Sequence, residues 1–325
     1  MKPFFQLICP RHKTPLSTRI KADCYICAEG CQYEIINGIP RFVSIKNYAS
    51  SFGLQWNRFR ATQLDSHTGL AISRDRLTRI AGGSLEIFKG RKTLEAGCGA
   101  GRFTELMLEA GAQVFAIDLS EAVDANYQNC SKFEGYYVAQ ADILNLPVSD
   151  EQFDIVVCIG VIQHTPDPET TMKALCSQVK PGGILLIDHY SQGYPITPVR
   201  QWIRSFLLGR SEETSMRYIQ GLVKVLWPFH MLMYRFRNNK NGQRAIALLM
   251  KWSPVVDYHY SYPQLGEQQL YEWALLDTHD TVTDRYKHLR KAEEIESALG
   301  SFGMIRIRTA YAGNGVEAWA QKPER

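Results

Sequence analysis

A glycine-rich turn near residue 97 constrains the fold more than any other stretch of this sequence. Residues 92–101 read Lys-Thr-Leu-Glu-Ala-Gly-Cys-Gly-Ala-Gly, so a short β-type run leads through an acidic residue into three glycines at alternate positions. The amphipathic segment 103–108 follows with helical spacing. Glycine allows backbone angles that are closed to other residues, and it lets a ligand approach the main chain. The stretch therefore predicts a strand, a binding turn and a helix in direct succession.

The spacing of these glycines points away from a phosphate ligand. Gly97, Gly99 and Gly101 form G-x-G-x-G, whereas G-x-G-x-x-G is the pattern that cradles a dinucleotide pyrophosphate on a helix N-terminus. Glycines occur in any tight turn, so the motif alone leaves an ordinary turn open as the alternative.

Two acidic residues at later strand ends extend the motif. A second strand is predicted at residues 113–117 and ends in Asp118, whose carboxylate can accept hydrogen bonds from both hydroxyls of a ribose. A third strand at residues 136–139 is followed by Asp142 and Ile143, which suit the edge and the face of an adenine ring. Agreement among glycines, acids and strands favours a nucleoside site over an ordinary turn.

This ordered series resembles the class I S-adenosylmethionine (SAM) methyltransferases. The resemblance covers residues 90–190 closely and residues 303–321 loosely. It implies an α/β fold with a Rossmann-like, doubly wound sheet of seven strands, an antiparallel edge strand, and SAM as cofactor. The residues that it assigns to SAM are Glu95, Gly97, Gly99, Gly101, Asp118, Leu119, Asp142, Ile143 and Ile159, joined by Phe52 and Trp56 from an earlier segment.

Cysteine and histidine pairs near the N-terminus predict a small metal-binding module. Cys9 and His12 form a C-x-x-H pair, and Cys27 and Cys31 form a C-x-x-x-C pair. Four such ligands suit tetrahedral, structural Zn²⁺ and leave no open position for catalysis. The segment resembles the zinc-ribbon-like module ahead of several bacterial methyltransferases, including ribosomal RNA guanine methyltransferases. Its ligand set departs from the usual one, Cys24 can substitute for Cys27, and an unmetallated β-module is the alternative.

A short aromatic element precedes the glycine turn. Phe52 and Trp56 lie in a Phe-Gly-x-x-Trp sequence, and a helix is predicted at residues 72–80. The element resembles one in a group of uncharacterised bacterial methyltransferases, which implies a position over the methionine end of SAM, where an aromatic face favours a sulfonium cation. An ordinary contact with the core is the alternative.

The loop after the fourth predicted strand contains the candidate base. A buried strand is predicted at residues 152–160, and Val161-Ile162-Gln163-His164-Thr165-Pro166-Asp167-Pro168 resembles the V-L-H-H-x-x-D-P loop of small-molecule methyltransferases. His164 is the first candidate for general base or acceptor positioning, and a histidine that only braces the loop is the alternative. His189 and Tyr190 are second candidates, because they follow the strand predicted at 184–188. A helix at 169–179 and a Lys-Pro-Gly-Gly turn at 180–183 should precede that strand.

A long insertion interrupts the alternation of strands and helices. Amphipathic runs at residues 199–207, 216–226 and 245–252 predict helices, the first with Arg200 and Arg204 on its polar face and the second stopped by Pro228. We expect a helical cap over the acceptor site, with a homodimer interface or a peripheral membrane contact as further uses of its apolar faces. Acids and histidines at 277–288 either point into the site or form a solvated loop.

The chain therefore divides into five expected parts. They are a zinc-ribbon-like module (1–45), a helical segment covering the SAM site (46–89), the SAM-binding core (90–190), the helical cap (191–285), and a C-terminal part (286–325). The last should supply a helix at 290–299 and a hairpin of strands 304–309 and 316–321 that completes the sheet.

Composition limits the functional classes only weakly. With 37 basic and 33 acidic residues the net charge is +4, which is too small to imply a polyanionic partner. Residues 159–162 lack the Asn/Asp-Pro-Pro-Tyr/Phe sequence with which nucleic acid amino-methyltransferases grip a flipped base, so nucleic acid is not the expected partner. Without a signal peptide or membrane span in the sequence, we expect a cytosolic protein whose cysteines are metal ligands or buried thiols.

The expected activity is methyl transfer from SAM to oxygen or nitrogen of a small or medium organic acceptor enclosed by the cap. Two alternatives remain at this point. One is a ribosomal or transfer RNA base methyltransferase, and the other is a SAM-binding or scaffolding protein without turnover.

Overall fold

The computed structural model describes residues 3–18, 23–44, 47–194, 197–236 and 238–325. The chain separates into two compact units. The first contains residues 1–57, 71–194 and 286–325, and the second contains residues 58–70 and 195–285. The boundary predicted between residues 45 and 46 lies outside the described residues.

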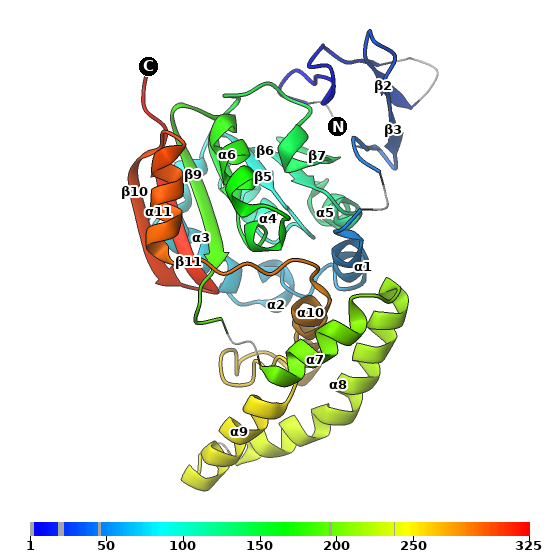
Figure 1. Cartoon of the computed structure of the whole chain (residues 1–325), viewed down its shortest axis with the longest axis vertical. Helices are drawn as coiled ribbons and strands as arrows, with labels where there is room; N and C mark the ends of the chain where they lie inside the picture. Colours follow the sequence, from blue (N-terminus) through cyan, green and yellow to red (C-terminus); the bar gives the residue numbers. More distant parts are fainter. Residues whose placement is uncertain (1–2, 19–22, 45–46, 195–196, 237) are drawn as a thin grey trace. The chain divides into compact units, whose positions relative to one another are not determined.

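The first unit is built on a seven-stranded sheet (Figure 1) with the strand order β10-β11-β9-β8-β5-β6-β7. Strands β5 to β9 run parallel to one another, and β11 pairs antiparallel with both β9 and the edge strand β10. The predicted Rossmann-like sheet with its C-terminal hairpin is thereby confirmed. The strands are β5 Lys92–Ala96, β6 Gln113–Asp118, β7 Tyr136–Gln140, β8 Phe153–Cys158, β9 Val179–Tyr190, β10 Ile305–Ala312 and β11 Gly315–Gln321.

Helices cover both faces of this sheet. In β6, Phe115 and Ile117 pack in a core with α6 and α11, whereas Val114 and Ala116 pack in a second core with α3, α4 and α5. Alternate residues of a strand point to opposite faces, so a strand that is apolar on both sides must be covered twice. The helices of this unit are α1 Ser50–Arg58, α3 Ile72–Ile80, α4 Thr104–Glu109, α5 Ala122–Cys130, α6 Pro168–Gln178 and α11 Ala292–Ser301, with short 3₁₀ turns at Leu85–Phe88, Ile143–Asn145 and Ile162–His164.

The turn predicted at residues 180–183 is instead part of strand β9. Val179 pairs with Phe153 and Ile184 pairs with Ile155, so β9 carries a bulge between these two pairs. Gly182 has a φ of 76° there, and a Cβ on Gly183 would lie 2.8 Å from a backbone carbonyl. The two glycines therefore permit an irregular strand.

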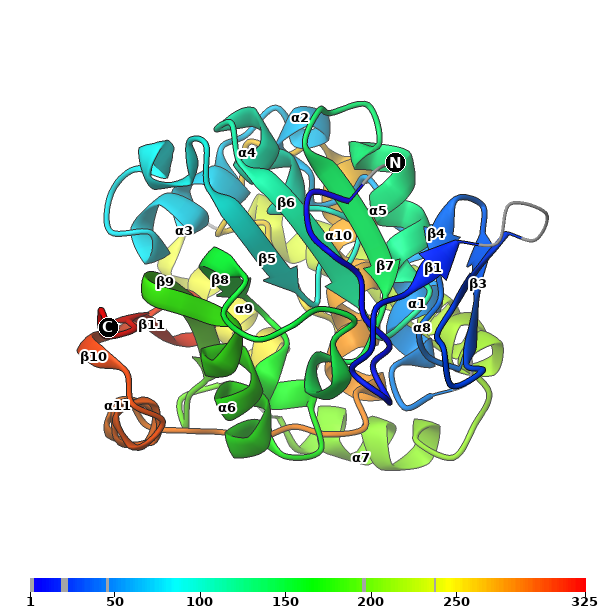
Figure 2. The same ribbon diagram turned by 90° about the horizontal axis from the view of Figure 1, so that it is seen from above.

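The N-terminal module belongs to the first unit and lies beside β7 (Figure 2). Arg41 forms a parallel bridge with Gln140, and the Phe42 amide donates to the Gln140 carbonyl at 2.8 Å. The ring of Phe5 lies 4.5 Å from that of Phe115 in the main core. The N-terminal module has a four-stranded antiparallel sheet, which comprises β1 Ser17–Thr18, β2 Cys24–Ile26, β3 Gln32–Ile36 and β4 Ile39–Pro40.

The second unit is helical, as predicted for this part of the chain. Its elements are α2 Asp65–Thr68, α7 Pro198–Leu207, α8 Glu212–Arg235, α9 Lys240–Trp252 and α10 Glu267–Thr283. No helix among the described residues combines the length and hydropathy needed to cross a bilayer.

Two expectations about these helices were wrong. Pro228 lies inside α8 and does not end it. Proline removes only one N–H donor, and the buried face of the helix, which includes Trp227 before the proline, continues with His230 after it. Arg200, expected on a polar face, is buried and donates to the carbonyl oxygens of Pro254 and Val255 at 3.1 Å each.

The acids and histidines near residue 280 do not form a solvated loop. Helix α10 continues to Thr283, and Thr278 and His279 are buried in it. Asp284 follows directly, is fully buried, and accepts a hydrogen bond from Nε of Arg204 at 2.9 Å. The Arg204–Asp284 pair therefore joins α7 to the end of α10 within the second unit.

Candidate active site

The carboxyl ends of β5 and β8 form the switch point of the sheet. From β5 the chain continues to β6 and β7 on one side, and it then returns to β8 on the other side. Open α/β sheets bind their ligands at such a point, outside the carboxyl ends of the strands. The glycine turn at 97–101 follows β5 here, and residues 159–164 follow β8.

The glycine turn is packed so closely that its glycines are required. Gly97, Gly99 and Gly101 have φ angles of 81°, 48° and 97°, which favour glycine. A Cβ on Gly97 would lie 2.2 Å from a methyl of Val161, and a Cβ on Gly101 would lie 2.8 Å from the sulfur of Cys130. The turn is therefore fixed between the loop after β8 and helix α5.

Asp118 connects the end of β6 to this turn. Its carboxylate accepts hydrogen bonds from the Gly99 amide at 3.0 Å and from the amide and hydroxyl of Ser120 at 2.9 and 2.6 Å. Burial raises the pKa of the carboxyl group, while these donors oppose that effect. The predicted ribose-binding acid thus lies at the carboxyl end of its strand, beside the glycines.

The other predicted nucleoside contacts follow β6 and β7. The Leu119 carbonyl accepts hydrogen bonds from Asn47 and Gln140 at 2.9 and 3.0 Å, which fixes the backbone after Asp118. Asp142 caps the 3₁₀ turn Ile143–Asn145 by accepting from the Leu144 amide at 2.9 Å. The structure brings these positions to neighbouring strand ends.

Glu95, near the carboxyl end of β5, is almost fully buried. The hydroxyl of Thr104, the first residue of α4, donates to its carboxylate. Burial raises the pKa of Glu95 to about 8. Its observed contact therefore joins the central strand to the helix after the glycine turn.

Helix α1 brings two aromatic side chains to the site. Trp56 packs on Gly99, where a Cβ would come within 3.2 Å of the indole ring, and the Phe52 ring lies 5.4 Å from that of His164. A Cβ on Gly53 would lie 3.0 Å from the Glu121 amide, so this glycine lets α1 approach the segment before α5. The Phe-Gly-x-x-Trp element therefore contacts both the glycine turn and the candidate base.

Sequence reasoning missed Tyr48 and Tyr286. Their rings lie 5.6 Å apart, and burial, together with the negative charges of Asp142 and Asp118, raises the pKa of Tyr48. Tyr48 therefore lies near both predicted nucleoside acids. Its position just before the Phe-Gly-x-x-Trp element is the one signal that could have identified it.

The candidate base His164 is buried at the switch point. It ends the 3₁₀ turn Ile162–His164, and its ring lies 5.2 Å from that of Tyr190 in an edge-on contact. Its Nδ1 lies 3.2 Å from the carbonyl oxygen of Tyr286. A proton on Nδ1 would donate to this carbonyl and leave the Nε2 lone pair as the basic site.

His189 has a similar backbone contact. Its Nδ1 lies 2.9 Å from the carbonyl oxygen of Tyr190, and burial lowers its pKa, which favours the neutral ring. A buried polar atom without a hydrogen-bond partner destabilises the fold. Among such atoms in the described part of the chain are Oε1 and Nε2 of Gln163, Nε2 of His189 and Nε2 of His288.

A C-terminal segment crosses the ends of β8 and β9. The His288 amide donates to the Gln163 carbonyl at 3.0 Å, and the Arg290 amide donates to the Tyr190 carbonyl at 2.9 Å. Residues 286–290 thus join the turn that contains His164 to the end of β9, the strand that contains His189. From the sequence, residues 286–288 could either point into the site or belong to a solvated loop. Their contacts with the ends of β8 and β9 were not predicted.

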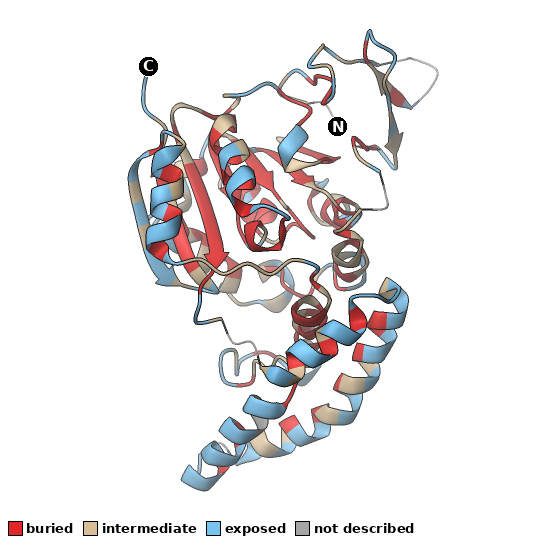
Figure 3. Cartoon of the chain, viewed as in Figure 1, coloured by how far each residue is buried: buried red, intermediate tan, exposed pale blue. Residues whose placement is uncertain are grey.

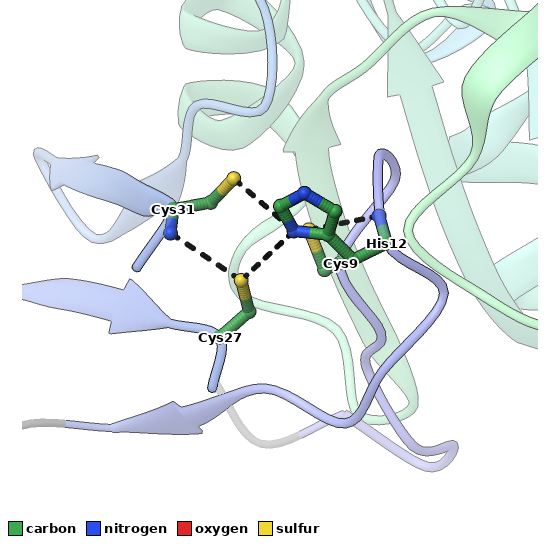
Figure 4. Close-up of side chains that lie close together, drawn as sticks. All are labelled: Cys9, His12, Cys27 and Cys31. Carbon is green, nitrogen blue, oxygen red and sulfur yellow. Dashed lines mark hydrogen bonds between the residues drawn. The ribbon is translucent and has the colours of Figure 1, made fainter. Parts of the chain in front are cut away.

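The predicted metal ligands form a tight cluster in the N-terminal module (Figure 4). One ligand atom from each of Cys9, His12, Cys27 and Cys31 lies within 4.8 Å of all the others. The Nδ1 of His12 is 3.7, 3.4 and 3.6 Å from the three sulfurs in that order. Sulfur and nitrogen ligands of tetrahedral Zn²⁺ lie about 3.6 Å apart. Cys24 is buried outside the cluster.

Hydrogen bonds to the sulfurs also suit thiolate ligands. The amide of His12 donates to Cys9 at 3.4 Å and the amide of Cys31 donates to Cys27 at 3.3 Å. Burial acts to raise the pKa of Cys9, but hydrogen bonds from Tyr33 and nearby amides outweigh it and lower the pKa to about 6. The donor set therefore fits Zn²⁺.

In comparisons with known proteins, one family model and several relatives match part of this chain. A family model described as a methyltransferase domain matches residues 94–187. A ubiquinone biosynthesis O-methyltransferase from Methylococcus capsulatus is 37% identical over 102 residues, covering 30% of this chain and 43% of that protein. One from Azoarcus sp. is 30% identical over 141 residues, covering 42% of this chain and 53% of that protein. The chain thus spans about half the length, or less, of these relatives.

Among solved structures, a SAM-dependent methyltransferase from Aquifex aeolicus is 13% identical to this chain. The match covers 85% of this chain and 98% of that one, with a TM-score of 0.44.

Proposed function

We propose that this chain, which carries a class I SAM-dependent methyltransferase domain, transfers a methyl group from SAM to an oxygen of a small or medium organic acceptor. The observation that carries the proposal is the buried His164 at the switch point, between the rings of Phe52 and Tyr190. The curated relatives are named O-methyltransferases, which supports oxygen as the acceptor atom.

The donor site is proposed at the carboxyl ends of β5, β6 and β7. Gly97, Gly99 and Gly101 would give the methionine end access to the backbone, and Asp118, which already contacts Gly99, would accept from the ribose hydroxyls. Asp142, Ile143 and the backbone at Leu119 would bind adenine, and Ile159 would line the site. Trp56 and Phe52 offer aromatic faces to the sulfonium.

His164 is the proposed general base. SAM supplies a methyl group that is already activated by the positive sulfur, so the protein must orient the acceptor and remove its proton. As the hydroxyl oxygen of a bound acceptor took the methyl group and the carbon–sulfur bond broke, Nε2 of His164 would receive the hydroxyl proton. Orientation supplies a large part of such a rate enhancement, and a well-placed base contributes about 10²–10⁴-fold.

The unpartnered atoms of Gln163, His189 and His288 are proposed to bind polar groups of the acceptor. A neutral His189 that donates from Nδ1 to Tyr190 presents Nε2 as an acceptor, and the Gln163 amide offers both a donor and an acceptor. A methyl-accepting substrate with a hydroxyl beside a second oxygen would form hydrogen bonds with these groups. Tyr190 would contribute its ring to the same site.

The second unit is proposed to take part in acceptor recognition, as expected for a cap. Its helices carry their own buried core, including Trp273 and Leu276 in α10. Hydrogen exchange measured with and without an acceptor tests this part, because protection confined to the first unit would contradict it.

We propose that Cys9, His12, Cys27 and Cys31 are the ligands of a structural Zn²⁺ ion. The cluster geometry and the thiolate-stabilising amides support it. The proposed role is structural, since all four coordination positions would be filled by protein.

Transfer of a tritiated methyl group from SAM into a cell extract tests the activity. Label in small organic molecules, absent with the His164→Gln variant, would support the proposal. Label in RNA would favour the RNA methyltransferase alternative. SAM binding without any transfer in several extracts would favour the non-catalytic alternative.

A further inference from the structure

We propose that helices α8 and α9 dock on the surface of an anionic lipid bilayer. The docking surface consists of the exposed apolar residues Val225, Phe229, Leu232, Phe236, Leu248 and Trp252, together with the exposed cations Lys224, Arg235, Arg244 and Lys251. This inference does not depend on the proposed methyl transfer, because it rests on a surface of the second unit alone.

Helix α8 is apolar on two faces. One face packs inside the second unit, where Ile219, Val223 and Trp227 are buried. Val225, Phe229, Leu232 and Phe236 follow one another at intervals of four, three and four residues, which places them on a different face. They are 66, 57, 45 and 50% exposed. A helix in water normally presents polar side chains on its outer face.

Helix α9 repeats this arrangement over a shorter length. Leu248 and Trp252, one turn apart, are 61 and 59% exposed, and Arg244 and Lys251 are exposed beside them. Figure 3 shows extended exposed faces on both helices. Phenylalanine, leucine and tryptophan next to lysine and arginine are typical of helices that lie in the interfacial region of a membrane.

The charge distribution identifies the partner. Residues 214–256 contain seven Lys and Arg residues and no Asp or Glu. The cations Lys224, Arg235, Arg244 and Lys251 form no ion pair within the part of the chain that the structure describes. Acidic headgroups would supply the missing negative charge close to the helices.

The same charges argue against a second copy of this chain. A two-fold dimer brings the same surface of both subunits together, so the cations of one copy would face those of the other. Interface cores are also depleted in lysine. A bilayer covers the apolar residues and neutralises the cations at once.

Flotation of the full chain with lipid vesicles tests the proposal. Vesicles of phosphatidylcholine and phosphatidylglycerol in equal amounts should bind the protein roughly tenfold or more better than phosphatidylcholine alone, and salt should weaken the binding. Equal binding to both vesicle types, or none, would overturn the proposal.

Two sets of variants assign the binding to this surface. Phe229→Ser with Phe236→Ser should reduce binding roughly tenfold or more, whereas Ile305→Ser, a change at an exposed apolar residue of the first unit, should not. Reversal of Lys224, Arg235 and Lys251 to glutamate should remove the preference for anionic lipid, and the same reversal of Lys89, Lys132 and Lys173 in the first unit should retain it. All these residues are exposed.

Light scattering tests whether a second copy of this chain, instead of a bilayer, covers the docking surface. The proposal expects one molecular mass in lipid-free solution at all protein concentrations. A dimer that Phe229→Ser dissociates, without any vesicle binding, would show that a second copy covers the surface and would overturn the proposal.

Discussion

Asp118 accepts a hydrogen bond of 3.0 Å from the backbone amide of Gly99, so the end of β6 and the turn after β5 hold each other in position. Two features that are 19 residues apart in the sequence therefore form one structural group. A substitution at either residue should weaken SAM binding, because it would also displace the other residue.

The Asp118→Asn variant should bind SAM about 10–100-fold more weakly, because a charge-assisted hydrogen bond is worth about 1.5–3 kcal/mol. Isothermal titration with SAM measures this directly. Asp75→Asn, at an exposed position on α3, is the matched control and should bind like the wild type. Unchanged affinity in Asp118→Asn would exclude Asp118 from the donor site.

Replacement of the two histidines should separate proton removal from acceptor binding. His164→Gln should lower kcat by about 10²–10⁴-fold, whereas His189→Gln should mainly raise the KM of the acceptor. Steady-state kinetics with each variant distinguishes the two. A His164→Gln enzyme with normal kcat would indicate an acceptor that needs no base, such as an amine.

The Gly101→Ala variant should lose about 2–4 kcal/mol of unfolding free energy. Its φ of 97° is unfavourable for alanine, and the new methyl would lie 2.8 Å from the Cys130 sulfur. Gly221→Ala in α8 meets no atom within 4 Å, and it should gain about 0.5–1 kcal/mol, since alanine suits a helix interior better. Denaturant unfolding of both variants checks this pair. Equal effects would contradict the tight packing of the glycine turn.

The purified chain should contain one zinc per molecule if the cluster binds metal as proposed. Cys9→Ser should abolish most of the zinc measured by mass spectrometry, whereas Cys24→Ser should retain it, since Cys24 lies outside the cluster. Chelation should lower the thermal stability of the wild type. Zinc lost from Cys24→Ser and kept in Cys9→Ser would reverse the ligand assignment.

The second unit should lose stability in acid. Asp257 contacts His230 and His259 at 2.5 Å each. Burial acts to raise its pKa, but these hydrogen bonds outweigh it and hold the pKa below the ordinary value of 3.8. The carboxylate therefore stabilises the fold above that value, and its contribution is lost as the pH falls below it.

Asp257→Asn tests this dependence. At neutral pH the variant should be about 3 kcal/mol less stable, because a buried pair loses one partner. The difference from the wild type should shrink in acid when denaturant unfolding is followed at several pH values. A constant difference would contradict the role of the carboxylate charge.

The parallel core could be predicted from sequence because local signals and buried periodicity agree there. The predicted helix at residues 72–80 matches α3, and the strands predicted after residues 92, 113, 136 and 152 match β5 to β8 within two residues. Asp118 and the glycines adjoin one another because parallel strands end at the same edge of a sheet. Local sequence therefore predicted the arrangement of the glycine turn and Asp118.

The remainder depended on contacts between distant residues. Nothing local shows that residues 286–290 cross β8 and β9, or that Arg200 is buried against carbonyl groups 54 and 55 residues away. Proline is a reliable helix terminator only where packing does not support the helix beyond it, and α8 is supported past Pro228. Long-range packing therefore decided the position of residues 286–290 and the burial of Arg200 in the helical unit.

The N-terminal module pairs through Arg41 with Gln140 at the carboxyl end of β7, which is the last strand of the sheet on that side. A strand at a sheet edge can pair with another protein molecule and start aggregation. Detachment of the module would therefore free the backbone of Gln140. This residue ends a strand whose sequence, Tyr-Tyr-Val-Ala-Gln, lacks charge and proline. Loss of the module should therefore favour self-association of the chain through this sheet edge.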